Sequence, residues 1–319
     1  MIKRRVISLL LVVLAIVVLL PIAPFVIALG IIIARTTRWK SIDRALVFAY
    51  LFLFFEVAGV CALTWVGVRY RNHALLIDKT YQIQFWWAQG LLDLASRLFN
   101  LKFSLSGQEL LDGPGFILVS RHTNIADNFF PIVFVAQYRQ KPVRYILKQE
   151  LQVVPTLDIG GNRLPCVFID RSGQQTEQEL KRVEALLLTS EADESVLIYP
   201  EGTRFSPAKR DAIAKKPGMQ AQTDRWPGLL PPRLGGIKTL LEANEDKDVV
   251  FLCHNGFEGS GGFTDLIDGS WLDTDVNIEF WRVPKADLPE DPETFIFSQW
   301  DRMQATLDRL RANQLNPAP

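Results

Sequence analysis

The sequence has few of the residues that bind metals or form disulfides. Its 319 residues include 3 cysteines and 3 histidines. Cys61, Cys166 and Cys253 are far apart, so they lack the short spacings of zinc sites, and an odd number does not fit a disulfide framework. We therefore expect reduced, structural cysteines and no metal centre.

An excess of charge of either sign is also absent. The chain has 35 lysines and arginines and 35 aspartates and glutamates, which give a formal net charge of zero. Without a net positive charge there is no global electrostatic attraction to nucleic acid, so we expect no nucleic-acid partner. Only local charged patches remain to be interpreted.

Long apolar runs, in contrast, fill the first quarter of the chain. Val6–Ala34 is uncharged and mostly apolar, and Ala45–Val68 is interrupted only by Glu56. Each is long enough to cross a bilayer, and the first is about twice as long as the hydrophobic region of a signal peptide. We interpret residues 1–75 as a membrane anchor. Glu56 is then either a functional intramembrane acid or an acid buried against a neighbouring helix.

The first apolar run is too long for one straight span. As a helix it would measure about 43 Å, against a hydrocarbon core of about 30 Å. Pro21 and Pro24 lie near its centre, and proline interrupts helices. A kinked, tilted span or a re-entrant pair is therefore expected. Lys3, Arg4 and Arg5 compete with the cations of the connecting loop, so the charges do not set the orientation.

Beyond the anchor, short apolar runs alternate with helical patterns. This alternation predicts an α/β fold with a mixed or largely parallel sheet flanked by helices. We assign residues 76–314 to this domain and residues 315–319 to a flexible tail. The expected strands are 115–119, 143–146, 166–169, 195–199, 249–253 and 276–281, and the expected helices are 81–98, 125–135, 176–188, 234–243 and 293–312.

A first motif follows the strand expected at 115–119. His122 stands five residues before Asp127, and Asn124 can cap the helix expected at 125–135. Five positions along a continuous helix separate two side chains by about 140°, so the pair meets only if His122 precedes the helix. The aspartate would then orient a histidine base. Alternatively, Asp127 only complements the helix dipole and His122 is a polar loop residue.

A second motif follows the strand expected at 195–199. Its residues, Pro200-Glu201-Gly202-Thr203-Arg204, come at the carboxyl end of the strand, where open α/β sheets place their sites. The strand expected at 166–169 is likewise followed by a cation, Arg171. Both motifs are therefore predicted to lie at one edge of the sheet.

These blocks together resemble the lysophospholipid acyltransferase family, which includes the 1-acylglycerol-3-phosphate acyltransferases. The family signature has three ordered blocks, met here by His122 with Asp127, by Phe168-Ile169-Asp170-Arg171 and by Glu201-Gly202-Thr203-Arg204. A looser fourth block is met by Leu230-Pro231-Pro232-Arg233. The resemblance covers about residues 85–260. Many members have asparagine before the histidine, where this chain has Arg121, which either contacts a phosphate or pairs with a neighbouring acid.

The resemblance and the chemistry of acyl transfer together suggest a role for each residue. His122 would take the proton of an attacking alcohol, and Asp127 would fix its tautomer. Arg204, Arg171 and Lys148 would hold the acceptor's phosphate. Glu201 would position Arg204 or accept from an acceptor hydroxyl, Gly202 would allow close backbone approach, and Thr203 belongs to the same binding block. No serine stands in a nucleophile elbow, so direct transfer without an acyl-enzyme is expected.

The predicted function is fatty acyl transfer from a thioester to the free hydroxyl of a lysophospholipid, most simply 1-acylglycerol 3-phosphate. The donor would be acyl-CoA or acyl carrier protein, used as cosubstrate, and no cofactor is expected. The basic stretch 205–227 could contact coenzyme A, an acidic carrier protein, lipid headgroups or solvent. An integral membrane location with the domain facing the cytoplasm is expected, since thioesters are made there. The alternatives are another lysophospholipid or lipid acceptor, or a non-catalytic lipid-binding scaffold.

Overall fold

A seven-stranded sheet forms the centre of the molecule. The computed structural model describes residues 2–169, 176–257 and 264–315. The strands are β1 (Lys102–Ser106), β2 (Phe116–Ser120), β3 (Val143–Lys148), β4 (Val167–Ile169), β5 (Ser195–Ile198), β6 (Asp248–His254) and β7 (Asp275–Val283). Their order in the sheet is β1-β7-β6-β2-β5-β3-β4. The five strands from β6 to β4 are parallel to one another, and β7 and β1 run antiparallel to these five. The mixed, largely parallel sheet predicted from the sequence is confirmed.

The central strand β2 explains why its sequence is an unbroken apolar run. A strand covered on both faces needs apolar side chains at every position rather than at alternate positions. Phe116 and Leu118 pack into the hydrophobic core on one face of the sheet, and Ile117 and Val119 pack into the core on the other face. All residues of β2 are buried. The turn that follows β2 is therefore held between two cores.

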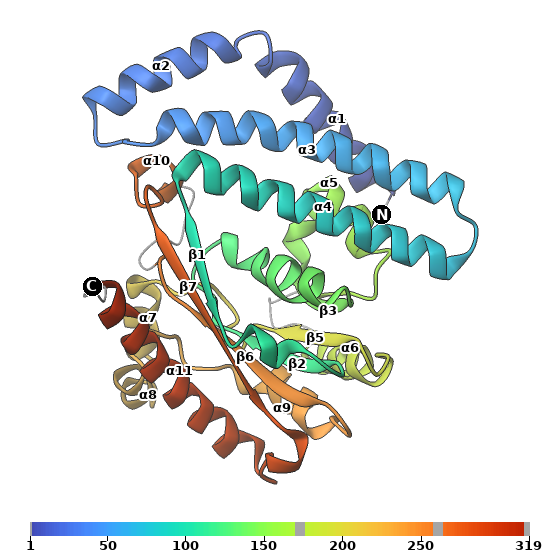
Figure 1. Ribbon diagram of the computed structural model, residues 1–319, viewed down its shortest axis with the longest axis vertical. Coiled ribbons are helices and arrows are strands. Elements are labelled where there is room, and N and C mark those ends of the chain that lie inside the picture. The colour runs from blue at the N-terminus through green and yellow to red at the C-terminus, as the bar shows by residue number, and fades with distance from the viewer. Residues whose placement is uncertain (1, 170–175, 258–263, 316–319) are drawn as a thin grey trace.

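Helices cover both faces of the sheet (Figure 1). On one face lie α4 (His73–Phe99) and the π-helical segment η3 (Pro131–Gln137). On the other lie α6 (Thr176–Leu188), α9 (Leu234–Glu242) and α11 (Pro292–Leu315). The other helical segments are α5 (Pro155–Gly161), α7 (Pro207–Ala214), α8 (Gln220–Arg225), α10 (Asp265–Asp268), η1 (Gln108–Leu111), η2 (Ala126–Asn128), η4 (Gln149–Val153) and η5 (Lys285–Asp287).

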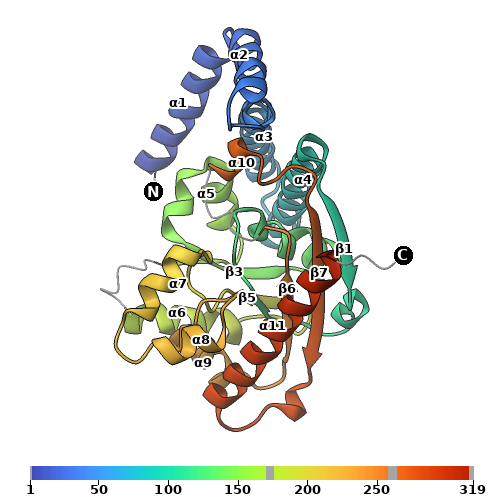
Figure 2. The same cartoon turned by 90° about the vertical axis from the view of Figure 1, so that its left-hand side faces the viewer.

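The apolar amino-terminal region forms three helices that lie away from the sheet (Figures 1 and 2). They are α1 (Ile2–Leu19), α2 (Ala23–Thr36) and α3 (Ile42–Arg69). The axes of α1 and α2 differ by 76° across a break of a few residues, as the two prolines predict. Pro24 falls in the first turn of α2, where a missing N–H costs nothing. By length and composition, α3 could cross a membrane, and the bent pair could be a broken span or a re-entrant loop.

Polar contacts connect these helices to the domain below them. The buried carboxylate of Glu56 in α3 accepts a hydrogen bond from the Thr156 N–H of α5 at 3.1 Å. Glu56 is thus packed against a neighbouring helix. The Arg163 guanidinium donates to the Leu63 carbonyl at 3.0 Å, and Arg4 pairs with the fully buried Asp158 at 2.6 Å. The amino-terminal end of α1 therefore lies beside α5.

Three details differ from the sequence-based expectation. The helix expected at 125–135 is a 3₁₀ turn followed by the π-helical segment. The first strand, β1, was not expected, because only Phe103 and Leu105 alternate with polar residues in its short sequence. The basic stretch 205–227 contains α7 and α8.

In α4, Trp87 is buried while Trp86 is exposed, so the two tryptophans have different environments. The expected tail lies almost wholly outside the described residues.

Candidate active site

The ends of four neighbouring parallel strands meet at one edge of the sheet. His122 follows β2, Glu201 follows β5, Lys148 closes β3 and His254 closes β6. Because these strands are parallel and adjacent, their carboxyl ends point the same way. The two sequence motifs are therefore brought together as predicted. Arg171, which was expected at the same edge, lies outside the described residues.

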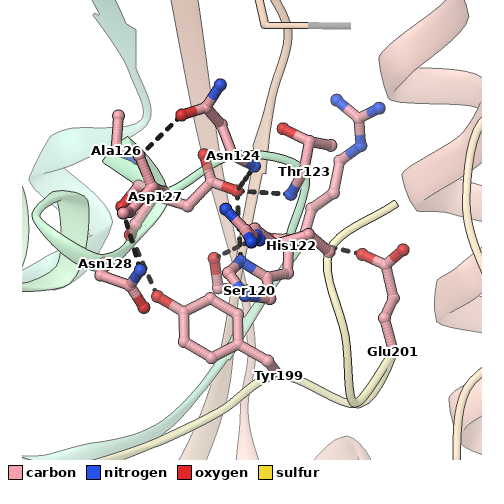
Figure 3. Close-up of polar contacts among 12 residues, drawn as sticks. Ser120, His122, Thr123, Asn124, Ala126, Asp127, Asn128, Tyr199 and Glu201 are labelled. Carbon is pink, nitrogen blue, oxygen red and sulfur yellow. Dashed lines mark hydrogen bonds and ion pairs between the residues drawn. The ribbon is translucent and has the colours of Figure 1, made fainter. Parts of the chain in front are cut away.

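His122 and Asp127 form a hydrogen-bonded pair. Nδ1 of His122 lies 3.3 Å from Oδ2 of Asp127, and Asp127 is in the 3₁₀ turn η2, so His122 precedes the helical segment as the spacing required. Asp127 is fully buried, and the His122 side chain is 13% exposed. An ionised carboxylate only accepts, so Nδ1 carries the proton and Nε2 has a free lone pair. Figure 3 shows the pair with its neighbours.

The backbone around Asp127 holds its carboxylate in place. Oδ2 accepts hydrogen bonds from the N–H groups of Thr123 and Asn124, the latter at 2.7 Å. The Asn124 side chain accepts from the Ala126 N–H at 3.0 Å, which forms an Asx turn that leads into η2. These local bonds replace the regular helix start that the sequence suggested. The carboxylate is consequently fixed before any substrate binds.

Asp127 stays ionised although it has no contact with solvent. Burial disfavours the charged form, but the charges and hydrogen bonds of His254 and His122 outweigh it and hold the pKa of Asp127 well below its usual value. His254 is fully buried, with Nε2 at 3.5 Å from Oδ1 of Asp127. His254 was not expected at the site from the sequence, although it directly follows the strand expected at 249–253.

Tyr199 is a second residue that the sequence motif did not single out. Its ring centroid lies 4.5 Å from that of His122, and its hydroxyl donates to the Asp127 backbone carbonyl at 3.0 Å. Tyr199 thus supports the histidine ring on one side and ties η2 to the end of β5. Its position directly before the Pro200-Glu201-Gly202 turn is the only sequence signal for this role.

Glu201 takes neither of the two roles expected for it. Its carboxylate is buried, with Oε1 accepting from the His122 N–H at 2.7 Å and Oε2 accepting from the Leu230 N–H at 2.9 Å. Among the described residues it forms no ion pair with Arg204. Both oxygens are occupied by backbone donors, so Glu201 holds the His122 turn instead of contacting an acceptor hydroxyl. Burial raises the pKa of Glu201 to about 7, against the opposing effects of these bonds and of Arg121.

Arg121 is also part of the fold. Its side chain is fully buried, and its guanidinium donates to the backbone carbonyls of His254 and of Gly228, the latter at 3.1 Å. A phosphate in solution cannot reach a guanidinium without exposed surface. Phosphate contact, the first interpretation of Arg121, does not fit this burial, and the hydrogen bonds above go to backbone carbonyls rather than to the neighbouring acid of the second interpretation. The contacts of Arg121 link the ends of β2 and β6 to the segment before α9.

Other cations remain accessible near the site. Arg204 is half-buried and Lys148 is exposed, where it pairs with Glu150 at 2.9 Å. The Lys209 ammonium donates to the Thr203 hydroxyl at 3.1 Å and to the Arg204 carbonyl at 2.8 Å. Burial lowers the pKa of Lys209, and the nearby charges of Arg204 and Lys148 lower it further. Arg204, Lys148 and Lys209, which we call the cation cluster, therefore share one electrostatic field.

The turn between Glu201 and the cation cluster requires glycine. Gly202 has φ of 68°, a conformation that residues with a Cβ rarely adopt. A Cβ at this position would also come within 2.7 Å of the Arg233 side chain. The Arg233 side chain therefore occupies the space that a Cβ at position 202 would need. In the part of the chain that the structure describes, no group of three histidine, cysteine, aspartate or glutamate residues could hold a metal ion.

Two comparisons with known proteins agree with this geometry. Residues 102–250 match the model of the Acyltransferase family. The fold is similar to that of the 1-acyl-sn-glycerophosphate acyltransferase PlsC from Thermotoga maritima, with a TM-score of 0.54, 16% sequence identity and coverage of 86% of this chain and 97% of that chain. The matched segment contains both motifs. Residues 102–250 therefore match the family that the motifs predicted, and the chain has a PlsC-like α/β fold.

Proposed function

We propose that this protein transfers a fatty acyl group from a soluble thioester to the free hydroxyl of a lysophospholipid, with 1-acylglycerol 3-phosphate as acceptor and phosphatidic acid as product. The observation that carries the proposal is the His122–Asp127 pair, with Nε2 of His122 free, at the same sheet edge as the cation cluster. A base and an anion site are the two elements that acylation of a phosphate-bearing alcohol requires.

The proposed mechanism uses His122 as base and then as acid. Nε2 takes the proton of the acceptor hydroxyl as its oxygen attacks the thioester carbonyl carbon. Asp127 stabilises the imidazolium through Nδ1–H, and its lowered pKa keeps it ionised for this task. The tetrahedral intermediate then collapses, the carbon–sulfur bond breaks, and His122 returns the proton to the departing thiolate. Ester and free thiol are the products.

The cysteines support direct transfer over a covalent acyl-enzyme. Burial raises the pKa of Cys166 to about 12, so its thiol is not a ready nucleophile. Cys253 is buried in the core on the α11 side of the sheet, with its sulfur 3.7 Å from the Met303 carbonyl. Cys61 belongs to α3 in the amino-terminal region. None of the three cysteines is placed as a partner of His122.

The cation cluster is proposed to bind the acceptor's phosphate. A guanidinium can hold two phosphate oxygens through parallel N–H donors, so Arg204 is the preferred anchor, with Lys148 as a second charge. Arg171, which follows β4 in sequence, is proposed to join them. Thr203 would act through its hydrogen bond with Lys209. The thioester can be acyl-CoA or acyl carrier protein, and no bound cofactor is needed for this chemistry.

We also propose that α1, α2 and α3 hold the domain on the membrane, with the active site facing the cytoplasm. Apolar side chains on these helices are exposed, and Phe25 reaches 76%. Surface of this kind is costly in water and suits a bilayer. Replacing Phe25 and Leu29 by serine should weaken binding to lipid vesicles in a flotation assay while activity on detergent-dispersed acceptor persists. Protease protection of sealed inverted membranes would give the orientation.

The acceptor and donor can be identified in one experiment. Purified protein is offered a panel of lysophospholipids with a labelled acyl-CoA or acyl carrier protein, and products are identified by mass. Phosphatidic acid formed faster than any other product supports the proposal. A preference for another lysophospholipid would change the proposed acceptor. If no combination of donor and acceptor gave a product, the result would support a non-catalytic lipid-binding protein.

A further inference from the structure

Asp127 lies between two histidines, and the proposed mechanism uses only one. Its Oδ2 faces His122 and two backbone N–H groups, whereas its Oδ1 faces His254, with Nε2 at 3.5 Å. Both Asp127 and His254 are fully buried. Among the described residues, neither Oδ1 of Asp127 nor Nε2 of His254 has a hydrogen-bond partner of good geometry, although the two atoms face each other. A buried carboxylate oxygen without a donor costs about 1 to 3 kcal/mol, so the placement of His254 opposite it needs an explanation.

The surroundings of His254 decide which of its nitrogens carries the proton. Nδ1 has no hydrogen-bond partner among the described residues, and the Phe130 ring packs edge-on against the imidazole with centroids 5.2 Å apart. A proton on Nδ1 would therefore be unsatisfied, whereas a proton on Nε2 points at Asp127. We therefore assign the proton that faces Asp127 to Nε2 of His254.

The backbone of His254 is fixed by an independent contact. Its carbonyl accepts from the buried guanidinium of Arg121, the residue directly before His122. The same guanidinium lies close enough to Glu201 to oppose the rise in that residue's pKa. The contacts of the described residues place Asp127, Arg121, Glu201 and Tyr199 around the two histidines. His254 cannot shift relative to the His122 turn without breaking the Arg121 bond.

We propose that His254 is a positioning residue for acyl transfer, which donates Nε2–H to Oδ1 of Asp127 so that Oδ2 stays aimed at His122. The proposal rests on the proposed function and deepens it, from a histidine–aspartate pair to a histidine–aspartate–histidine array. His254 has no exposed surface, so it does not touch either substrate. It acts only through Asp127.

The first test compares two substitutions. His254→Gln keeps an N–H donor at a similar reach, whereas His254→Leu removes it. His254→Leu should lower kcat about tenfold to a hundredfold, which corresponds to about 1.4 to 2.7 kcal/mol, with the KM of both substrates nearly unchanged. His254→Gln should restore most of kcat. Phe257→Leu is the matched control, since Phe257 also packs on the Phe130 ring.

A double-mutant cycle tests whether His254 acts through Asp127. In an Asp127→Ala background, His254→Leu should cause no further loss of kcat, since the group it positions is gone. The proposal would be overturned if the losses of kcat from the two substitutions were fully additive. It would also be overturned if His254→Leu and His254→Gln lowered kcat equally, or if His254→Leu had a normal kcat. A wild-type protein without acyl transfer to any acceptor would instead overturn the proposed function.

A second measurement does not depend on turnover. Spectra of ¹⁵N-histidine protein should show a slowly exchanging Nε2–H proton that disappears in His254→Gln and shifts in Asp127→Asn. The protein has 3 histidines, so assignment by substitution is direct. Absence of this proton, or its indifference to Asp127→Asn, would contradict the His254–Asp127 hydrogen bond even if the enzyme is active.

Discussion

The carboxylate of Glu201 accepts a hydrogen bond from the backbone N–H of His122 at 2.7 Å. The glutamate of the second sequence motif thus holds the histidine of the first. Its other oxygen binds the Leu230 N–H, and the His122 carbonyl accepts from the Phe205 N–H at 2.7 Å. One buried acid therefore joins three segments that are far apart in sequence. The two motifs are a single structural unit.

The catalytic pair gives the first prediction. His122→Ala should lower kcat by several orders of magnitude, because the group that takes the proton of the alcohol is removed, while acceptor binding and membrane association remain. Asp127→Asn should cost less but still a large factor, since the tautomer of His122 is no longer fixed. Single-turnover kinetics with labelled thioester measure both. Near wild-type turnover in His122→Ala would exclude the mechanism.

Glu201→Gln should weaken both the fold and the activity. An amide has one acceptor oxygen, so either the His122 N–H or the Leu230 N–H would face an NH₂ group and lose its partner. The expected loss of stability is about 1 to 3 kcal/mol, with a fall in kcat because the His122 turn is freed. Denaturant unfolding in detergent micelles and steady-state kinetics measure the two effects. Thr203→Ser, at the same turn, is the control for general perturbation.

The stability of the wild-type protein should fall between pH 5 and pH 8 through Glu201. Its folded pKa of about 7 is raised from 4.5 by burial, so the folded state holds this proton more tightly than the unfolded state does. The contribution of Glu201 to the free energy of unfolding is therefore complete below its unfolded-state pKa. This contribution, about 3 kcal/mol, is lost as the pH rises through the folded-state pKa. Unfolding free energies measured across this range should show a smaller fall in Glu201→Gln. Parallel curves would argue against the raised pKa.

Arg204→Lys separates phosphate recognition from structural support. Lysine keeps the charge but loses the two parallel donors, so kcat/KM for the acceptor should fall by about one to two powers of ten. Thermal stability should stay the same, because Arg204 has no ion pair with the buried Glu201 among the described residues. Arg210→Lys is the matched control, since Arg210 pairs with Asp211 at 2.9 Å within the same segment. An unchanged acceptor KM and kcat/KM would remove Arg204 from the proposed phosphate site.

The sequence by itself determined the α/β architecture, the match of residues 102–250 to the acyltransferase family and the neighbourhood of the two motifs. Each rests on a local pattern with a physical cause: apolar runs become buried strands, parallel strands bring their carboxyl ends to one edge, and prolines break the first apolar run. Helix geometry also set the condition under which His122 and Asp127 can meet, namely that His122 precedes the helical segment, and the structure meets this condition.

Only the tertiary structure decided what the individual charged residues do. The motifs contain or adjoin three charged residues with different fates. Arg121 and Glu201 are buried and bind backbone groups, whereas Arg204 stays accessible. Burial is set by which segments pack around a residue, and the packing partners here, Gly228, Leu230 and His254, are remote in sequence. His254 reaches Asp127 only because β6 lies beside β2 in the sheet.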